Sequence, residues 1–392
     1  MASDFGLPAN VHPETGFGVA AGPTLAEVGE GETLKRIFPR LPHADAELLG
    51  PGDDSAVVAA PDGRFVVTTD LMVHGPDFRS AWSSSHDLGV KAAMTNLADV
   101  AAMGARPTAL VVALAAPLDT PVDVLLGIAD GLRDGCALAA PGCGVVGGDL
   151  SASPALMIAV TAFGDLEGRA PVTRSGARPR DQLAVAGDLG RAGAGLWLLF
   201  RDAVVGEDAA GGGAVADGAA GDAAAGEGGA GDGAVGERVP DAGRAAEVRD
   251  AHPELVSAQL APVVPIALGV PAALGGATAM LDVSDGLVLD ARRLAVASGC
   301  SVQLDPAAIE LEAQALRELD PVVGERAASF VLAGGEDHAL LATFPPGPLP
   351  EGFRRLGNVL DRSAAPDVLV GDTPYAELGG WDPYDGWNGA AG

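Results

Sequence analysis

Basic residues are scarce in this 392-residue sequence: 24 Lys and Arg oppose 53 Asp and Glu, which gives a formal net charge of −29. Proteins that bind nucleic acids or anionic membranes contact phosphate groups through clustered Lys and Arg. We therefore predict no nucleic-acid partner and no membrane partner. Only Lys35 and Lys91 are lysines, and neither follows a glycine, so the sequence contains no Walker A loop for binding phosphate.

Cysteines and long apolar runs are also scarce. Cys136, Cys143 and Cys300 form no CxxC pair, and their odd number argues against a disulfide framework. The longest apolar stretch, residues 109–118, is about half as long as a membrane-spanning helix. The first residues also lack the basic start and apolar run of a secretory signal. These absences predict a cytoplasmic protein in a reducing compartment.

Several catalytic motifs are missing as well, namely the GxSxG nucleophile elbow, the HExxH zinc motif and a GxGxxG loop after a clear strand. A bound nucleotide would therefore be held by metal ions, backbone amides and arginine. Arg174, which lies between two glycine-rich turns, is the best cationic candidate. An ordinary surface arginine is an equally good interpretation of the same residue.

The order of apolar runs predicts a mixed α/β (α+β) fold with two lobes, because runs of strand and helix length alternate in both halves of the chain. We divide the sequence into a loose leader at 1–23, an N-terminal domain at 24–166 and a C-terminal domain at 167–392. The predicted helices lie within 24–41, 83–104, 121–138, 194–200, 252–268, 287–298 and 307–319. The predicted strands lie at 55–60 and 65–73, which a turn at 61–63 joins as neighbours, and at 109–117, 144–149, 156–164, within 178–190, and at 277–286, 301–305, 340–344 and 367–370.

Residues 203–247 interrupt this pattern with Ala and Gly, together with 9 acidic residues and 2 arginines. Such a stretch cannot bury enough apolar surface to offset the entropy lost on ordering it. We predict a disordered, low-complexity insertion in a loop. An insertion that recruits a partner protein is the alternative.

Carboxylate and hydroxyl side chains occur where apolar runs end beside small residues. These positions are Asp54, Thr68, Thr69, Asp70, Asp149 after Gly148, and Asp282 and Asp285 on either side of Ser284. Asp99 follows Asn96 by one helical turn and shares its face of the helix. Singly, each Asp is more simply a turn residue, a helix N-cap or a solvated position. Their recurrence after apolar strands favours hard cations such as Mg²⁺, and hence metal-assisted phosphate chemistry.

A larger set of motifs appears in a fixed order along the chain. The set comprises GDDSAVV (52–58), TTDLMV (68–73), DLGVKAAMTNLADVAAMGARP (87–107), GGD (147–149), TRSGARPRD (173–181), MLDVSDGL (280–287), GGEDHALL (334–341) and GGWD (379–382). It resembles the thiamine-monophosphate kinase family, whose superfamily also holds aminoimidazole ribonucleotide synthetase and selenophosphate synthetase. The resemblance runs from about residue 24 to residue 383, apart from the insertion.

The resemblance implies ATP-dependent phosphorylation of thiamine monophosphate to thiamine diphosphate, the last step of thiamine diphosphate biosynthesis, by direct transfer with several Mg²⁺ ions. It also implies a homodimer in which the N-terminal lobes pair their sheets. The implied magnesium ligands are Asp54, Thr69, Asp70, Asp99, Asp149, Asp282 and Asp285, with Thr68 assisting. The implied ATP contacts are Gly148, Asp149, Arg174 and Ser284, and the implied substrate contacts are Asp77, Glu336 and Trp381, with Trp387 as a competing choice for the last. We assign no general base, because the attacking phosphate is already ionised at neutral pH.

One position departs from the family pattern. In many relatives the segment after TTD ends in a His-Phe pair whose histidine contacts the substrate. Here the segment reads LMVHGPDF, which places Asp77 at that point and His74 three residues earlier. Either Asp77 takes over the contact or the substrate phosphate is held differently, and we do not transfer the role to His74.

Two other functions remain open from the sequence. Another ATP-dependent synthetase of the superfamily, acting on a small phosphorylated substrate, would share most of these motifs, although GGED and GGWD favour the kinase. A non-catalytic acidic protein would bind cations without turning over ATP, but it would leave the ordered set of motifs unexplained.

Overall fold

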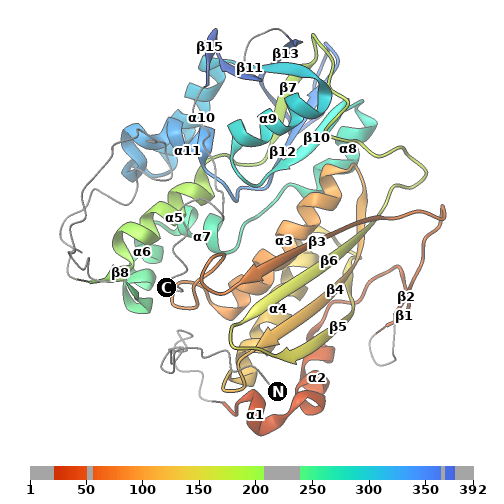
Figure 1. Cartoon of the computed structure of the whole chain (residues 1–392), viewed down its shortest axis with the longest axis vertical. Helices are drawn as coiled ribbons and strands as arrows, with labels where there is room; N and C mark the ends of the chain where they lie inside the picture. Colours follow the sequence, from red (N-terminus) through yellow and green to blue (C-terminus); the bar gives the residue numbers. More distant parts are fainter. Residues whose placement is uncertain (1–21, 51–55, 207–238, 363–366, 376–392) are drawn as a thin grey trace, which may run out of the picture.

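The structure is a computed structural model that describes residues 22–50, 56–206, 239–362 and 367–375. Two lobes follow one another along the longest axis of the molecule, each built on its own main sheet (Figure 1). The N-terminal lobe contains α1 (Leu25–Val28), α2 (Glu30–Ile37), η1 (Phe38–Arg40), β1 (Glu47–Leu49), β2 (Val57–Val58), β3 (Val66–Val73), α3 (Ser85–Ala102), β4 (Arg106–Ala116), α4 (Val122–Ala139), β5 (Gly144–Ala152) and β6 (Met157–Asp165).

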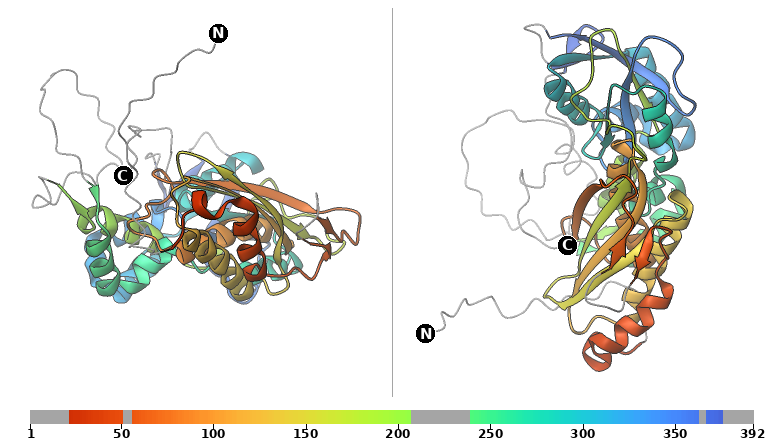
Figure 2. Two further views of the ribbon diagram at one scale, coloured as in Figure 1. Left: turned by 90° about the horizontal axis from the view of Figure 1, so that it is seen from below. Right: turned by 90° about the vertical axis from the view of Figure 1, so that its right-hand side faces the viewer.

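The main sheet of the N-terminal lobe has the strand order β3-β6-β4-β5, in which only β4 and β5 run parallel. Helices α3 and α4 cover one face of this sheet (Figure 2). The opposite face is covered only in part, by a small cluster of Ala44, Ala109 and Val146 against which Ala56 and Val58 pack. Val67 and Leu71 of the edge strand β3 remain exposed on the rest of that face.

Helix α3 is the central element of the molecule. Ser84 begins it with a capping box, in which its side chain accepts from the Asp87 amide and the Asp87 side chain accepts from the Ser84 amide. Only Ser85, His86 and Asp99 of its residues are not buried. The helix packs on β3, β4 and β6 below and on β10, β12, α7 and α8 of the other lobe above, and so it joins the two lobes.

Helices α3 and α4 approach each other unusually closely at two glycines. A Cβ atom on Gly131 would lie 2.1 Å from the His86 carbonyl oxygen, and one on Gly89 would lie 2.1 Å from the Ile128 carbonyl oxygen. These are backbone atoms, which cannot rotate away as a side chain does. Glycine is therefore required at the crossing of the two helices.

The C-terminal lobe is built on a seven-stranded sheet of order β10-β12-β7-β13-β11-β14-β15. Its strands are β7 (Gln182–Ala186), β10 (Ala279–Val283), β11 (Cys300–Leu304), β12 (Ala339–Phe344), β13 (Arg354–Asp361), β14 (Val368–Val370) and β15 (Thr373–Pro374). Its helices are α5 (Arg191–Asp202), α6 (Ala242–Ala251), α7 (Pro253–Leu260), η2 (Ile266–Leu268), α8 (Gly269–Leu274), α9 (Leu287–Ser298), α10 (Pro306–Leu319), η3 (Pro321–Arg326) and α11 (Ala327–Ala333). Leu183, Leu281, Leu287 and Val302 belong to its apolar core.

The predicted pairing of the strands at 55–60 and 65–73 is wrong. The turn at 61–63 is present, with Gly63 in the left-handed region at a φ of 75°. However, β2 pairs with β1, whereas β3 pairs along its whole length with β6. The turn residues specify a change of direction, but the partner of β3 is set by an eight-residue ladder to a strand that lies far away in sequence.

Two other predictions need correction. The stretch predicted as a disordered insertion, 203–247, contains regular structure at both ends, because β8 (Val204–Val205) pairs with β9 (Val239–Pro240), and α6 begins at Ala242. Residues 207–238, like the leader at 1–21, lie outside the described residues. The helix predicted at 252–268 ends at Leu260. Pro262 and Pro265 have no backbone N–H, so they cannot donate the hydrogen bonds that would continue it. Within the described residues, no helix is long and apolar enough to cross a membrane.

Candidate active site

Thr68 and Asp70 of β3 lie on the face of the sheet that packs against α3, next to Asn96 and Asp99 of that helix. Thr68 donates its hydroxyl to Asp99 Oδ2 at 2.7 Å, and the Asp70 amide donates to Asn96 Oδ1 at 3.1 Å. Thr68 and Asp70 share this face because alternate residues of a strand point the same way. Thr69 points to the other face, where its hydroxyl donates to the Val160 carbonyl and accepts from Thr161.

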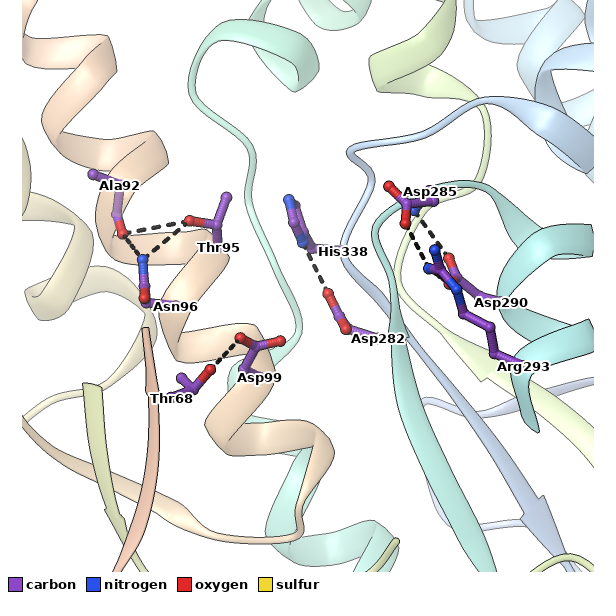
Figure 3. Close-up of polar contacts among 10 residues, drawn as sticks. All are labelled: Thr68, Ala92, Thr95, Asn96, Asp99, Asp282, Asp285, Asp290, Arg293 and His338. Atoms are coloured by element: carbon purple, nitrogen blue, oxygen red, sulfur yellow. Dashed lines mark hydrogen bonds and ion pairs between the residues drawn. The ribbon is translucent and has the colours of Figure 1, made fainter. Parts of the chain in front are cut away.

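The C-terminal lobe brings a second acidic group to the same place. Asp282 lies at the end of β10, with Oδ2 3.0 Å from His338 Nδ1. Asp285 lies in the following turn, 2.5 Å from Arg293 Nη1, and its amide donates to Asp290. Figure 3 shows Asp99 and Thr68 on one side of the junction, with Asp282 and Asp285 on the other.

The carboxylates of the two lobes lie in one another's electric field. Desolvation, then the nearby charges of Asp282 and Asp70, raise the pKa of Asp99 to about 7, although the Thr68 hydrogen bond opposes the shift. Desolvation also raises the pKa of Asp70; His338 opposes this, and Asp282 and Asp285 add to it. The negative charges of the two lobes therefore repel one another across the junction.

This charge distribution suits a divalent cation. The side chains that converge are oxygen donors, which Mg²⁺ prefers. A bound cation would also offset the electrostatic repulsion between their negative charges. Within the described residues, however, no three His, Cys, Asp or Glu side chains are close enough to form a complete metal site. Asp282 and Asp285 are instead paired with His338 and Arg293.

The loop at 334–338 ties three elements to this junction through three consecutive side chains. Glu336 contacts Lys91 of α3, with Nζ 2.8 Å from Oε1. Asp337 accepts from the Gly190 and Ala192 amides, at 2.6 and 2.9 Å, at the start of α5. His338 contacts Asp282, as described above. Glu336 and His338 both have left-handed backbones, with φ of 67° and 51°, a conformation that non-glycine residues adopt only when their surroundings enforce it.

We expect Asp337 to make the protein less stable as the pH rises toward neutrality. Burial raises the pKa of its carboxyl group to about 7, although the two α5 amides lower it in part. Because this folded-state pKa exceeds the unfolded value of about 3.9, folding takes up a proton. The resulting stabilisation is complete below about pH 4 and is lost as the pH rises through about 7.

Urea unfolding of the wild type and Asp337→Asn between pH 4 and 8 measures this effect. The free energy of unfolding of the wild type should fall by roughly 2–4 kcal/mol more than that of the variant over this range. Glu254→Gln is the matched control, since Glu254 is an exposed acid in the first turn of α7. Parallel curves for the wild type and Asp337→Asn would contradict the expectation.

Comparisons with known proteins place this site in a family. Residues 52–166 match the family model described as AIR synthase related protein, N-terminal domain. The thiamine-monophosphate kinase of Mycobacterium tuberculosis is 39% identical over 362 residues, which is 92% of this chain and 93% of that protein. The Corynebacterium glutamicum protein of the same name is 36% identical over 366 residues, 93% of this chain and 96% of that protein. The chain belongs to the thiamine-monophosphate kinase family.

Solved structures of thiamine-monophosphate kinases agree with the fold. A structure from Aquifex aeolicus matches with a TM-score of 0.60 at 26% identity, over 81% of this chain and 91% of that chain. The structure of AaThiL complexed with AMPPCP and TMP matches with a TM-score of 0.61 at 26% identity, over 84% of this chain and 90% of that chain. The predicted mixed α/β fold and the predicted family are both confirmed.

The residues that the thiamine-monophosphate kinase resemblance selects are only partly brought together in this chain. Thr68, Asp99, Asp282 and Asp285 line the junction between the lobes (Figure 3). Asp70 lies in the electric field of Asp282 and Asp285. Gly148 and Asp149 lie instead on β5, the opposite edge of the sheet from β3. Asp149 there accepts from the Ser151 hydroxyl at 2.9 Å.

The other predicted contacts are spread around the same junction. Arg174 is exposed, and its carbonyl accepts from Ser298 at 2.9 Å. The Ser284 carbonyl accepts from the Glu336 amide at 2.7 Å, which joins two of the family motifs directly. Asp54 and Trp381, together with Trp387, lie outside the described residues.

Asp77, which stands where the family has histidine, is half-buried after β3. Its Oδ2 accepts from the Val73 amide at 2.7 Å. The pKa of Asp77 is raised, chiefly by burial and further by the charge of Glu336. The hydrogen bond from the Val73 amide and the charge of Lys91 oppose this shift. Asp77 therefore lies in the field of the Lys91–Glu336 pair, which supports a place beside the site. His74 instead contacts Ser80 and Phe78, so nothing here assigns it a role at the site.

Three residues at the junction were not selected from the sequence. His338 directly follows the GGED motif, and its contact with Asp282 arises from the left-handed turn of that loop. Lys91 lies among buried helix positions, and its isolation as one of two lysines is the one signal that could have drawn attention to it. Gln259, on α7, reaches Glu336 from a segment that carries no family motif.

Proposed function

We propose that this protein transfers the γ-phosphoryl group of ATP to thiamine monophosphate, forming thiamine diphosphate and ADP. The observation that carries the proposal is the 39% identity to a thiamine-monophosphate kinase over 92% of the chain. The convergence of carboxylates from both lobes at one junction supports it independently. The reaction would complete the synthesis of thiamine diphosphate.

We propose that Mg²⁺ is bound at this junction by Asp70, Asp99, Asp282 and Asp285, with Thr68 assisting. The resemblance also selects Asp54, Thr69 and Asp149. Because Thr69 points away from α3 and Asp149 lies on β5, these two would bind a cation other than the one at the junction. Phosphoryl transfer requires little covalent catalysis by the protein, because charge spreads over the oxygens of a loose transition state. Bound Mg²⁺ would neutralise the phosphates of ATP, and it explains how an acidic site accepts an anionic nucleotide.

The chain's own residues would orient the two substrates. We propose that Gly148, Arg174 and Ser284 contact ATP, together with Asp149. Glu336, Asp77 and Trp381 would contact thiamine monophosphate. Glu336 supports this assignment, since it keeps 29% of its side chain exposed although its partner Lys91 is buried. No general base is assigned, because the attacking phosphate oxygen is already ionised.

We also propose that the protein is a homodimer and that its domains divide near residue 166, as the two main sheets suggest. The partly uncovered face of the N-terminal sheet supports the dimer, because Val67 and Leu71 expose apolar side chains there. A second copy of this chain would cover that face. Light scattering of Leu71→Glu against the wild type tests the dimer, which the variant should weaken.

The test of the function is product analysis with purified protein, ATP, Mg²⁺ and thiamine monophosphate. We expect thiamine diphosphate and ADP in equal amounts, and no product after chelation of the metal with EDTA. Restoring Mg²⁺ in excess of EDTA should restore turnover. Thiamine supplied in place of the monophosphate should give no product.

Two results would contradict the proposal. Product formed equally well with EDTA present would exclude the proposed role of Mg²⁺. ATP binding without turnover of thiamine monophosphate would point to a different phosphorylated acceptor, and would remove the assignments of Glu336 and Trp381 first.

A further inference from the structure

The substrate-facing carboxylate of Glu336 is held by two buried side chains from other elements. Lys91, in the middle of α3, has Nζ 2.8 Å from Glu336 Oε1, and its side chain is 5% exposed. Gln259 of α7 donates from Nε2 to the other oxygen, Oε2. Both oxygens of Glu336 are therefore fixed, one from each lobe.

The position of Lys91 is costly for a lysine. A buried ammonium group loses its hydration and is tolerated only when it is paired. The chain's other lysine, Lys35, shows the common alternative, since its side chain is 77% exposed and pairs with Glu32 within one turn of α2. A packing role alone would be met by an apolar residue, so the charge of Lys91 calls for a separate explanation.

Gln259 carries a similar cost. Its side chain is buried, and its Oε1 has no hydrogen-bond partner among the described residues. The amide cannot be turned round to correct this, because Glu336 Oε2 requires a donor. An unpaired buried acceptor destabilises a protein. The position of Gln259 is therefore better explained by its contact with Glu336 than by a contribution to stability.

Electrostatics at the three residues agree with this geometry. Burial by itself would raise the pKa of Glu336, but Lys91 and Gln259 more than offset burial, and the net pKa is lowered. Glu336 therefore stays ionised. An ionised carboxylate with one exposed edge is complementary to the cationic thiazolium ring and the amino group of a thiamine compound.

We propose that Lys91 is a positioning residue that, with Gln259, fixes the Glu336 carboxylate for binding thiamine monophosphate. Lys91 acts through Glu336 and does not contact the substrate. Lys91 belongs to the N-terminal lobe and Glu336 to the C-terminal lobe. The contact therefore forms, and orients Glu336, only when the two lobes are docked. This role rests on the proposed function.

Steady-state kinetics of Lys91→Met test the proposal, with Lys35→Met as the matched control. The KM for thiamine monophosphate should rise about 10- to 100-fold, which corresponds to losing a hydrogen bond to a charged group. The KM for ATP should change less than about twofold, because the proposed ATP contacts lie on other elements. Lys91→Arg should recover part of the loss, and Lys35→Met should match the wild type.

A double-mutant cycle separates positioning from stability. If Lys91 acts only through Glu336, then Lys91→Met adds nothing to the KM effect of Glu336→Gln. The double variant also carries no unpaired charge, so it gives the same test if Lys91→Met alone does not fold. Additive KM effects, or equal increases in KM for both substrates, would overturn the proposal.

Failure of the proposed function would look different. A wild type that does not turn over thiamine monophosphate would count against the function, and calorimetric binding of thiamine monophosphate would then replace KM in the cycle. If the wild type turns over thiamine monophosphate and Lys91→Met has the same KM for it, only the proposed role of Lys91 is overturned.

Discussion

Asp282→Asn should lower kcat/KM by about 10²- to 10³-fold and raise the Mg²⁺ concentration needed for half-maximal rate. Asp282 is the carboxylate most central to the junction, because its charge raises the pKa of both Asp70 and Asp99. The amide would keep the shape of the side chain and lose its charge. Cation binding would weaken, whereas the surrounding strands would keep their pairing.

The measurement is initial rate against Mg²⁺ at saturating ATP and thiamine monophosphate. Asp361→Asn is the matched control, since Asp361 also ends a strand of the same sheet but is exposed, and it should behave as the wild type. Wild-type rates with an unchanged Mg²⁺ dependence in Asp282→Asn would refute the assignment. An equal loss of rate at every Mg²⁺ concentration would limit Asp282 to a role apart from cation binding.

Gly131→Ala should destabilise the protein by about 3 kcal/mol, which would lower the thermal midpoint by about 4 °C. The added methyl group would meet the His86 carbonyl oxygen at 2.1 Å, so α3 and α4 would have to separate. Leu88 and Ile128 flank this crossing and are fully buried, and their packing would loosen. Thermal unfolding monitored by circular dichroism measures the loss.

Gly31→Ala provides the opposite expectation in the same experiment. Gly31 lies in the exposed helix α2, and a Cβ atom there would have no neighbour within 4 Å. Alanine should raise stability by about 0.5–1 kcal/mol, because it reduces the backbone freedom of the unfolded chain. A Gly131→Ala variant as stable as the wild type would mean that the helices are not held at this distance in solution.

Elements with local signals were predictable from the sequence. Helix α9 spans 287–298 as predicted, and α3 begins beside its predicted polar caps. Strand β13 was not predicted, because Arg354, Arg355 and Asn358 break any alternation of apolar and polar residues. It is held by partners distant in sequence, such as the pairing of Arg354 with Glu312 of α10. The wrong partner for β3 has the same cause, since local residues do not encode long-range pairing.

The candidate site was predictable as a set of residues but not as an arrangement. Acids that end apolar strands were recognisable, and the charges of Asp70 and Asp282 do act on Asp99. The distance of Asp149 from them follows from strand order, which the sequence does not state. The counter-charges of the site, His338 and Lys91, come from a left-handed loop and a buried helix face. Both residues lie within recognised motifs, but the motifs do not say which carboxylate each one contacts.

The short pairing of β8 with β9 has a practical consequence for engineering. It brings Val205 and Val239 side by side, so the chain leaves and re-enters the C-terminal lobe at one point. Loops whose ends are already adjacent tolerate changes of length at small entropic cost. A reporter domain or an affinity tag could therefore replace residues 207–238 while both lobes keep their packing, and the same point would accept new chain termini in a circular permutant.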